Sequence, residues 1–216
     1  MGFLLNHPLL AAAAAAAAVL VASVWPATPA RTQLAPPKIE KRAPAPGSAL
    51  PKTPAERDRT LSDLYALLAT AENETAAKAF AEGIERVWHY SGSPTIDLLL
   101  GRATKAVSQK NYDSALRFLD NVVEQAPDFT EGWSRRAYVH FQRNELVLAL
   151  GDLRRTLALD PHHFKALDGL SQVLREIGQK KAALSVMERL YDVHPHWPGL
   201  PQAIEELSRE VEGQGI

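Results

Sequence analysis

The feature of this sequence that most constrains its fold is a period of 34 residues in its second half. Four columns of similar residues recur at that spacing: Pro127, Pro161 and Pro195; Ala115, Ala149 and Ala183; Ala103, Ala137 and Ser171; Leu99, Trp133 and Leu167. Four columns in one register are hard to obtain by chance, and a fixed period of roughly 20–50 residues is typical of proteins built from stacked units. The period therefore predicts a repeat architecture.

Each repeat unit is expected to contain two helices. Small residues such as Ala137 and Ala149 allow the two helix backbones to approach closely, while bulky residues at Trp133 and Leu153 fill the space beside them. Pro161 then ends the second helix, because proline lacks the backbone N–H and clashes with the preceding turn. One hairpin cannot bury its apolar face alone, so neighbouring units must stack.

The 34-residue spacing and the residue types in these columns resemble the tetratricopeptide repeat. The best single match contains Trp133, Ala137, Ala149 and the ending Leu159-Asp160-Pro161. The resemblance implies an all-α fold, a right-handed α-solenoid of helix-turn-helix repeats with one concave surface. It implies three repeats, at residues 94–129, 130–163 and 164–197.

A helical hairpin is expected before these repeats, at residues 54–93. Its start, Thr53-Pro54-Ala55-Glu56, is typical of a capped helix N-terminus. Shifting the repeat register back by 34 residues places Ala69 and Ala81 in the small-residue columns, so the hairpin is interpreted as a degenerate repeat or N-terminal cap. At the other end, residues 198–216 predict a capping helix, polar on its outer face, and a tail.

The first 53 residues divide into an apolar and a Pro-rich segment. Residues 1–30 contain an alanine-dominated apolar run followed by small residues, which is typical of a secretory signal peptide cleaved near Ala27 or Ala30. The alternative is an uncleaved anchor in the inner membrane, although a span usually needs about 20 apolar residues. Residues 31–53 predict a disordered linker rich in Pro and basic residues. The expected location is periplasmic or secreted.

Composition excludes several classes of function. Lys plus Arg (24) nearly balances Asp plus Glu (25), so no positive field is expected to attract phosphates, and nucleic acid is not an expected partner. The chain has no cysteine, which excludes disulfides and thiol chemistry. It also contains no phosphate-binding loop, hydrolase elbow, zinc-protease motif or dinucleotide fingerprint. The sequence therefore predicts a binding protein, with no catalytic residues, cofactor or metal site.

The resemblance also implies which residues line a binding groove, since family members usually bind partners along the concave face, on the first helix of each repeat. The matching positions are Asp97, Leu100, Thr104 and Val107; Glu131, Ser134, Tyr138 and Phe141; and Lys165, Asp168, Gln172 and Arg175. Tyr138 and Phe141 combine a large contact area with few rotamers, as binding anchors do. Their alternative role is packing against the neighbouring helix.

Some family members capture the C-terminal carboxylate of a chaperone through Lys and Asn residues of this groove. Here the matching positions hold other residues: Leu100, Thr104, Tyr138, Asp168 and Gln172. The carboxylate clamp is therefore absent. A ligand with an apolar stretch and one or two charges is expected instead.

These features predict an exported scaffold or adaptor of the cell envelope that binds a protein or peptide and touches the membrane only through an uncleaved N-terminal segment. The alternative is an accessory protein that binds a metal or small ligand for a transport or maturation system. That alternative is based on histidines at equivalent turns of two successive repeats, His162-His163 and His194-Pro195-His196. Polar residues also suit exposed turns, so the histidines do not require a metal.

Overall fold

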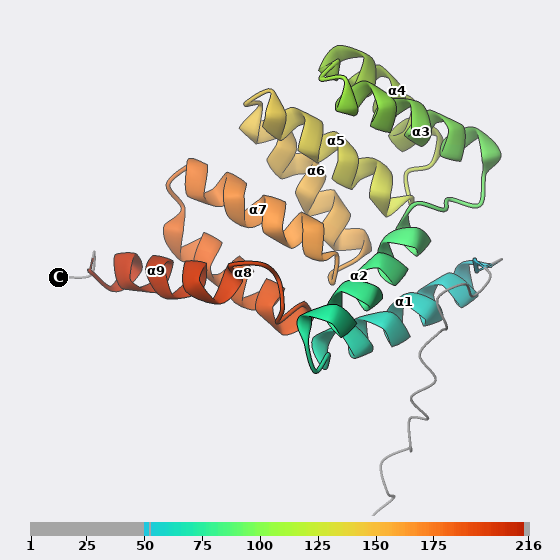
Figure 1. Cartoon of the computed structure of the whole chain (residues 1–216). Helices are drawn as coiled ribbons and strands as arrows, with labels where there is room; N and C mark the ends of the chain where they lie inside the picture. The colour runs from blue at the N-terminus through green and yellow to red at the C-terminus, as the bar shows by residue number, and fades with distance from the viewer. Residues whose placement is uncertain (1–49, 52, 214–216) are drawn as a thin grey trace, which may run out of the picture. The chain divides into compact units, whose positions relative to one another are not determined.

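The computed structural model describes residues 50–51 and 53–213, which form nine α-helices and no strands (Figure 1). The helices are α1 (Pro54–Ala69), α2 (Glu74–Trp88), α3 (Pro94–Ser108), α4 (Tyr112–Gln125), α5 (Thr130–Gln142), α6 (Leu146–Leu159), α7 (Phe164–Glu176), α8 (Lys180–Val193) and α9 (Leu200–Gly213). The expected signal or anchor segment at 1–30, almost all of the linker at 31–53 and the end of the C-terminal tail lie outside these residues.

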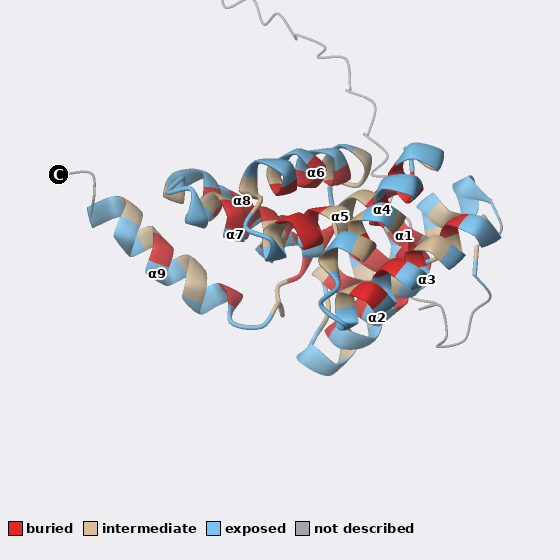
Figure 2. Ribbon diagram, turned by 90° about the horizontal axis from the view of Figure 1, so that it is seen from above, coloured by how far each residue is buried: buried red, intermediate tan, exposed pale blue. Residues whose placement is uncertain are grey.

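Three helical hairpins, α3–α4, α5–α6 and α7–α8, pack one after another along the chain. Their first helices begin at Pro94, Thr130 and Phe164, the first residues of the three predicted repeats. The buried residues lie along the faces where the helices meet (Figure 2). This arrangement confirms the predicted all-α solenoid of helical repeats.

The small-residue columns lie where the helices approach most closely. Ala103, Ala115, Ala137, Ala149 and Ala183 are all at most 1% exposed. Trp133 differs from its expected role, because it is only partly buried. Its indole nitrogen donates a hydrogen bond to the Pro127 carbonyl (3.0 Å), and the Arg136 guanidinium lies 4.9 Å from its ring centre.

The turn inside each repeat contains a residue with left-handed backbone geometry. Lys110, Asn144 and Gly178 have φ angles of 56°, 60° and 78°, and they are again 34 residues apart. This geometry closes the first helix of each pair and is adopted most easily by glycine, then by asparagine. The turn is therefore repeated in backbone conformation although its residue type is not.

The N-terminal hairpin, formed by α1 and α2, packs against the C-terminal repeat. The helix α1 contacts α8, and the buried residues of α1 and α2 share one core with α7 and α8. The Tyr65 hydroxyl donates a hydrogen bond to Asp160 (2.6 Å), and His196 contacts the Ala71 carbonyl (2.9 Å). The hairpin thus crosses the turns that follow α6 and α8.

Aromatic packing explains that position. The Trp88 side chain is 1% exposed and stacks on His163 with 3.7 Å between ring centres. It also lies 4.6 Å from Phe164. Contact between the large Trp88 and Phe164 rings removes apolar surface from water. This burial favours docking of the hairpin at the start of α7.

The core is divided into two clusters. One joins α1 and α2 to α7, α8 and α9, and the other lies mainly between α3 and α4 and includes Phe129 and Val139. Ala137, two residues before Val139 on α5, belongs to the first cluster. The helix α5 is therefore shared between the two. At the C-terminus, α9 packs on α8 through Leu200 and Leu207.

Candidate binding groove

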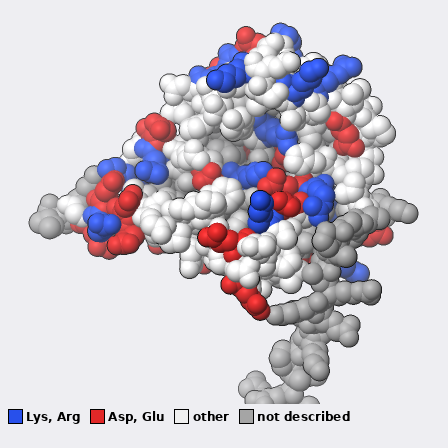
Figure 3. Space-filling model, viewed as in Figure 1, with Lys and Arg blue, Asp and Glu red and all other residues white. Residues whose placement is uncertain are grey.

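A hollow of about 520 Å³ lies among the first helices of the three repeats. We call it the groove. Its lining residues are Ala103, Thr104, Val107, Leu119, Glu131, Ser134, Arg135, Ala137, Tyr138, Phe141, Gln142, Leu153, Lys165, Asp168, Gly169, Gln172 and Trp197. Acidic and basic side chains lie next to one another near the middle of this face of the molecule (Figure 3). The groove therefore combines an apolar floor with charged walls.

The structure brings most of the predicted groove residues together. Those that line the groove are Thr104, Val107, Glu131, Ser134, Tyr138, Phe141, Lys165, Asp168 and Gln172. They come from α3, α5 and α7. Positions at three- and four-residue steps on each helix share a face, which is why these side chains line the same hollow.

Three predicted residues do not line it. Leu100 is 3% exposed and belongs to the core between α3 and α4. Asp97 is engaged in the loop before α3, where its carboxylate accepts hydrogen bonds from the Ser91 backbone N–H (2.9 Å) and hydroxyl (2.6 Å). Arg175 is exposed near the end of α7, beyond the hollow. The groove is therefore shorter than the row of predicted positions.

Two aromatic side chains give the groove its contact area. Tyr138 is 51% exposed, so its ring is not a core residue. Phe141 is partly buried and packs on the larger core cluster while it also lines the groove. The two residues therefore differ: Phe141 packs against the core, as the alternative role proposed, whereas Tyr138 is exposed to solvent.

Sequence reasoning missed two prominent lining residues. Arg135 lies on α5 four residues after Glu131, but it is not one of the family's lining positions. Its long side chain folds back toward Glu131 (Nε to Oε1, 2.6 Å). Trp197 is the last residue of the third repeat and lies in the loop between α8 and α9. The family's lining positions all lie on the first helix of a repeat, so they do not include a residue of this loop.

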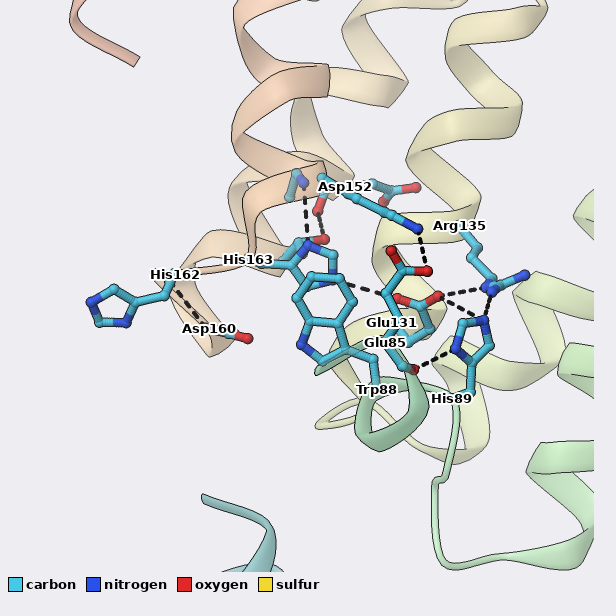
Figure 4. Close-up of polar contacts among 12 residues, drawn as sticks. Glu85, Trp88, His89, Glu131, Arg135, Asp152, Asp160, His162 and His163 are labelled. Atoms are coloured by element: carbon cyan, nitrogen blue, oxygen red, sulfur yellow. Dashed lines mark hydrogen bonds and ion pairs between the residues drawn. The ribbon is translucent and has the colours of Figure 1, made fainter. Parts of the chain in front are cut away.

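A buried carboxylate anchors one end of the groove (Figure 4). Glu131 is 5% exposed. Its two oxygens face Arg135 and His163, and the His163 Nε2 lies 3.4 Å from Oε2. Burial acts to raise the pKa of Glu131, but the hydrogen bond with His163 and the charge of Arg135 outweigh it and lower the pKa to about 2. Glu131 is therefore ionised and structural.

The helix α2 closes the same end of the groove. Its Glu85 carboxylate pairs with Lys165 (Nζ to Oε2, 2.8 Å), and His89 contacts both Arg135 and Glu131. Two positive lining residues thus already have acidic partners, one in the groove and one on α2. Tyr138 and Asp168 take no part in these ion pairs, and both line the groove with part of their surface exposed to solvent.

The turn histidines have packing roles. His163 is fully buried against Trp88, and its Nδ1 accepts a hydrogen bond from the Ala166 N–H (3.2 Å). His194 is buried beside Phe164, and burial lowers the pKa of His194. No group of three or more His, Cys, Asp or Glu suited to a metal ion occurs within residues 53–213. Packing and hydrogen bonding account for His163, whereas the buried Nδ1 of His194 has no hydrogen-bond partner among the described residues.

In the part of the chain that the structure describes, no helix has the length and apolar content of a membrane span.

Comparison with known proteins decides the family. No protein-family model matches the chain. A TPR repeat-containing protein of Rhizobium etli is 30% identical over 205 residues, which cover 95% of this chain and 95% of that protein. The chain belongs to the tetratricopeptide-repeat family. The present chain is also 31% identical over 154 residues to human sperm-associated antigen 1. That match covers 68% of this chain and 16% of the human protein.

Solved structures support the fold of this TPR protein. The first TPR domain of Spaghetti (RPAP3), bound to an HSP90 peptide, matches with a TM-score of 0.53 at 18% identity, over 56% of this chain and 95% of that domain. The Sgt2 TPR domain from Aspergillus fumigatus matches with a TM-score of 0.52 at 20% identity, over 56% of this chain and 81% of that domain. At such low sequence identities, these matches show the fold alone.

Proposed function

We propose that this TPR protein is a non-catalytic scaffold or adaptor that binds a peptide or a protein segment in its groove. The observation that carries the proposal is the half-exposed Tyr138 ring beside an apolar floor, in a hollow of about 520 Å³. An exposed aromatic side chain in a concave site is typical of binding anchors.

The comparison with the Spaghetti domain supports this proposal, because that domain is bound to an HSP90 peptide. The chemistry of the groove agrees with binding. Its strongest acid, Glu131, is held by Arg135 and His163 and is not free to move protons. General acid–base catalysis needs a group whose pKa lies near the working pH, and Glu131 has a pKa of about 2.

We also propose that the protein is exported and acts in the cell envelope. Only the N-terminal sequence supports this, through its alanine-rich apolar run and the small residues after it. Fractionation of cells followed by N-terminal sequencing tests it. A mature N-terminus after Ala27 or Ala30 is expected for the cleaved form, an intact N-terminus in the membrane fraction for the anchored form, and an intact cytoplasmic protein would contradict both.

Site-specific photo-crosslinking tests the binding function. A photoreactive phenylalanine at position 138 is expected to capture a partner in the native cell, because that side chain extends into the groove. The matched control is position 191, since Tyr191 is 44% exposed but lies on α8 outside the groove. Equal capture at the two positions would contradict the assignment of the groove as the binding site.

A further inference from the structure

We infer that the groove selects an apolar peptide that carries a Lys or Arg side chain, with the cation placed at Asp168. This inference rests on the proposed function and adds the sign of the charge that the ligand brings. It follows from the charges that the fold leaves uncompensated in the groove.

Four ionisable side chains of opposite sign line the hollow: Glu131, Arg135, Lys165 and Asp168. Glu131 is paired with Arg135, and Lys165 is paired with Glu85 on α2. Asp168 takes part in no ion pair among residues 53–213. The groove therefore keeps one negative charge that no side chain of the described chain neutralises.

Asp168 is also well placed to meet a ligand. It lies on α7 in the accessible part of the hollow, and its Oδ2 accepts a hydrogen bond from Gln172 (2.7 Å). That bond fixes the carboxylate without cancelling its charge, because the amide is neutral. Burial raises the pKa of Asp168, although hydrogen bonds from Gln172 and Trp197 partly oppose it. A cation bound there would remove this desolvation cost.

The surroundings of Asp168 suit the stem of a long cationic side chain. Val107, Phe141 and Trp197 line the same hollow and present apolar surface, on which the methylene groups of Lys or Arg can pack. The aromatic rings of Tyr138 and Trp197 also line the hollow, and aromatic rings attract cations. A neutral apolar side chain would leave the partly buried Asp168 carboxylate unpaired, and an acidic one would repel it.

The Spaghetti domain, which shares the fold, binds a peptide of mainly acidic charge. The HSP90 peptide bound by the Spaghetti domain has the sequence SRMEEVD, which ends in acidic residues. Its two Glu residues and its Asp outnumber its single Arg, so the peptide brings a net negative charge to a groove that already keeps an unpaired carboxylate. We therefore expect SRMEEVD to bind far more weakly here than a peptide with a central Lys.

Fluorescence anisotropy with three peptide libraries tests the inference on the folded chain. The probes are acetylated and amidated heptapeptides of apolar residues with Lys, norleucine or Glu fixed at the centre. The Lys library is expected to bind about tenfold more tightly than the norleucine library, as for a partly desolvated charge pair. Asp168→Asn should abolish that preference, and Asp168→Lys should reverse it in favour of Glu. Asp192→Asn, an exposed position on α8 outside the groove, is the matched control.

The outcomes distinguish the inference from the function beneath it. If the three libraries bind the wild-type protein equally, and binding is lost in Tyr138→Ala, the charge selectivity is wrong while the groove remains a binding site. Preference for the Glu library would also overturn the inference. No binding by any library would overturn both. If Asp168→Asn does not fold, the comparison of Lys with norleucine peptides on the wild-type protein still decides.

Discussion

At the scale of single residues, the turn inside each repeat shows how one backbone conformation is held by different amino acids. Lys110, Asn144 and Gly178 all adopt positive φ angles at equivalent positions. A non-glycine residue pays about 1–2 kcal/mol for this conformation. The three turns therefore have the same shape but unequal cost.

Exchanging these residues should shift stability in opposite directions. Lys110→Gly is expected to raise the free energy of unfolding by about 0.5–1 kcal/mol, because the relief of strain exceeds the added chain entropy of glycine. Gly178→Ala should lower it by about 1 kcal/mol. Urea denaturation of both variants measures this. A loss of stability in Lys110→Gly would show that its side chain contributes more than its backbone costs.

The Glu131 carboxylate should make stability depend on acid. Its pKa in the folded protein is about 2, below the ordinary value of 4.5, so its contribution is complete above about pH 4.5 and is lost as the pH falls toward 2. The shift corresponds to on the order of 3 kcal/mol. We expect Glu131→Gln to flatten the decline of the unfolding free energy between pH 4.5 and 2. Urea titrations at several pH values, with the exposed Glu124→Gln as control, would measure this.

At the scale of elements, a single glycine sets how closely α4 and α5 approach. A Cβ atom at Gly132 would lie 2.7 Å from the Val122 Cγ1, which is too close for carbon atoms. Gly132→Ala is therefore expected to cost about 1–3 kcal/mol. Gly151 on α6 has no atom within 4 Å of such a Cβ, so Gly151→Ala should be stabilising by about 0.5–1 kcal/mol. Thermal unfolding of the pair separates crowding from helix propensity.

The N-terminal hairpin depends on Trp88 for its docking. Removing this ring takes away the stacking on His163 and the hydrogen bond from its Nε1 to the Tyr65 hydroxyl (3.2 Å). Trp88→Ala should cost about 3–5 kcal/mol and expose the segment 89–93 to protease. Limited proteolysis measures the release of the hairpin, and Tyr191→Ala serves as a surface control. An unchanged cleavage rate would mean that other contacts hold the hairpin.

At the scale of the whole molecule, the two core clusters differ in how many helices pack around them. The main contacts of α3 and α4 are with each other and with α5, whereas α7 and α8 are also held by the hairpin and α9. The amides of α3 and α4 are therefore expected to exchange hydrogen faster than those of α7 and α8. Hydrogen exchange followed by mass spectrometry tests this. Trp88→Ala should accelerate exchange in α1, α2, α7 and α8 and leave exchange in α3 and α4 unchanged.

The sequence predicts those parts of the fold that repeat. The alanine and proline columns show the three hairpins because each column reflects a local packing or termination requirement, and the groove positions of α5 and α7 follow from the same register. The docking of the N-terminal hairpin could not be predicted, since Trp88 and His163 meet only through contacts between distant segments. The left-handed turns were also hidden, because Lys110, Asn144 and Gly178 share a backbone angle and no chemistry.

The contact between Ala71 and His196 joins residues 125 positions apart, so it can form only after the whole intervening chain has been synthesised. At about 5–20 residues per second, a ribosome takes roughly 6–25 s to make that intervening chain. Helices and small hairpins form within microseconds, so α1 and α2 are complete long before α7 and α8 exist. During those seconds Trp88 lacks the His163 and Phe164 rings on which it packs in the folded protein. A factor that protects nascent chains would find its binding segment there.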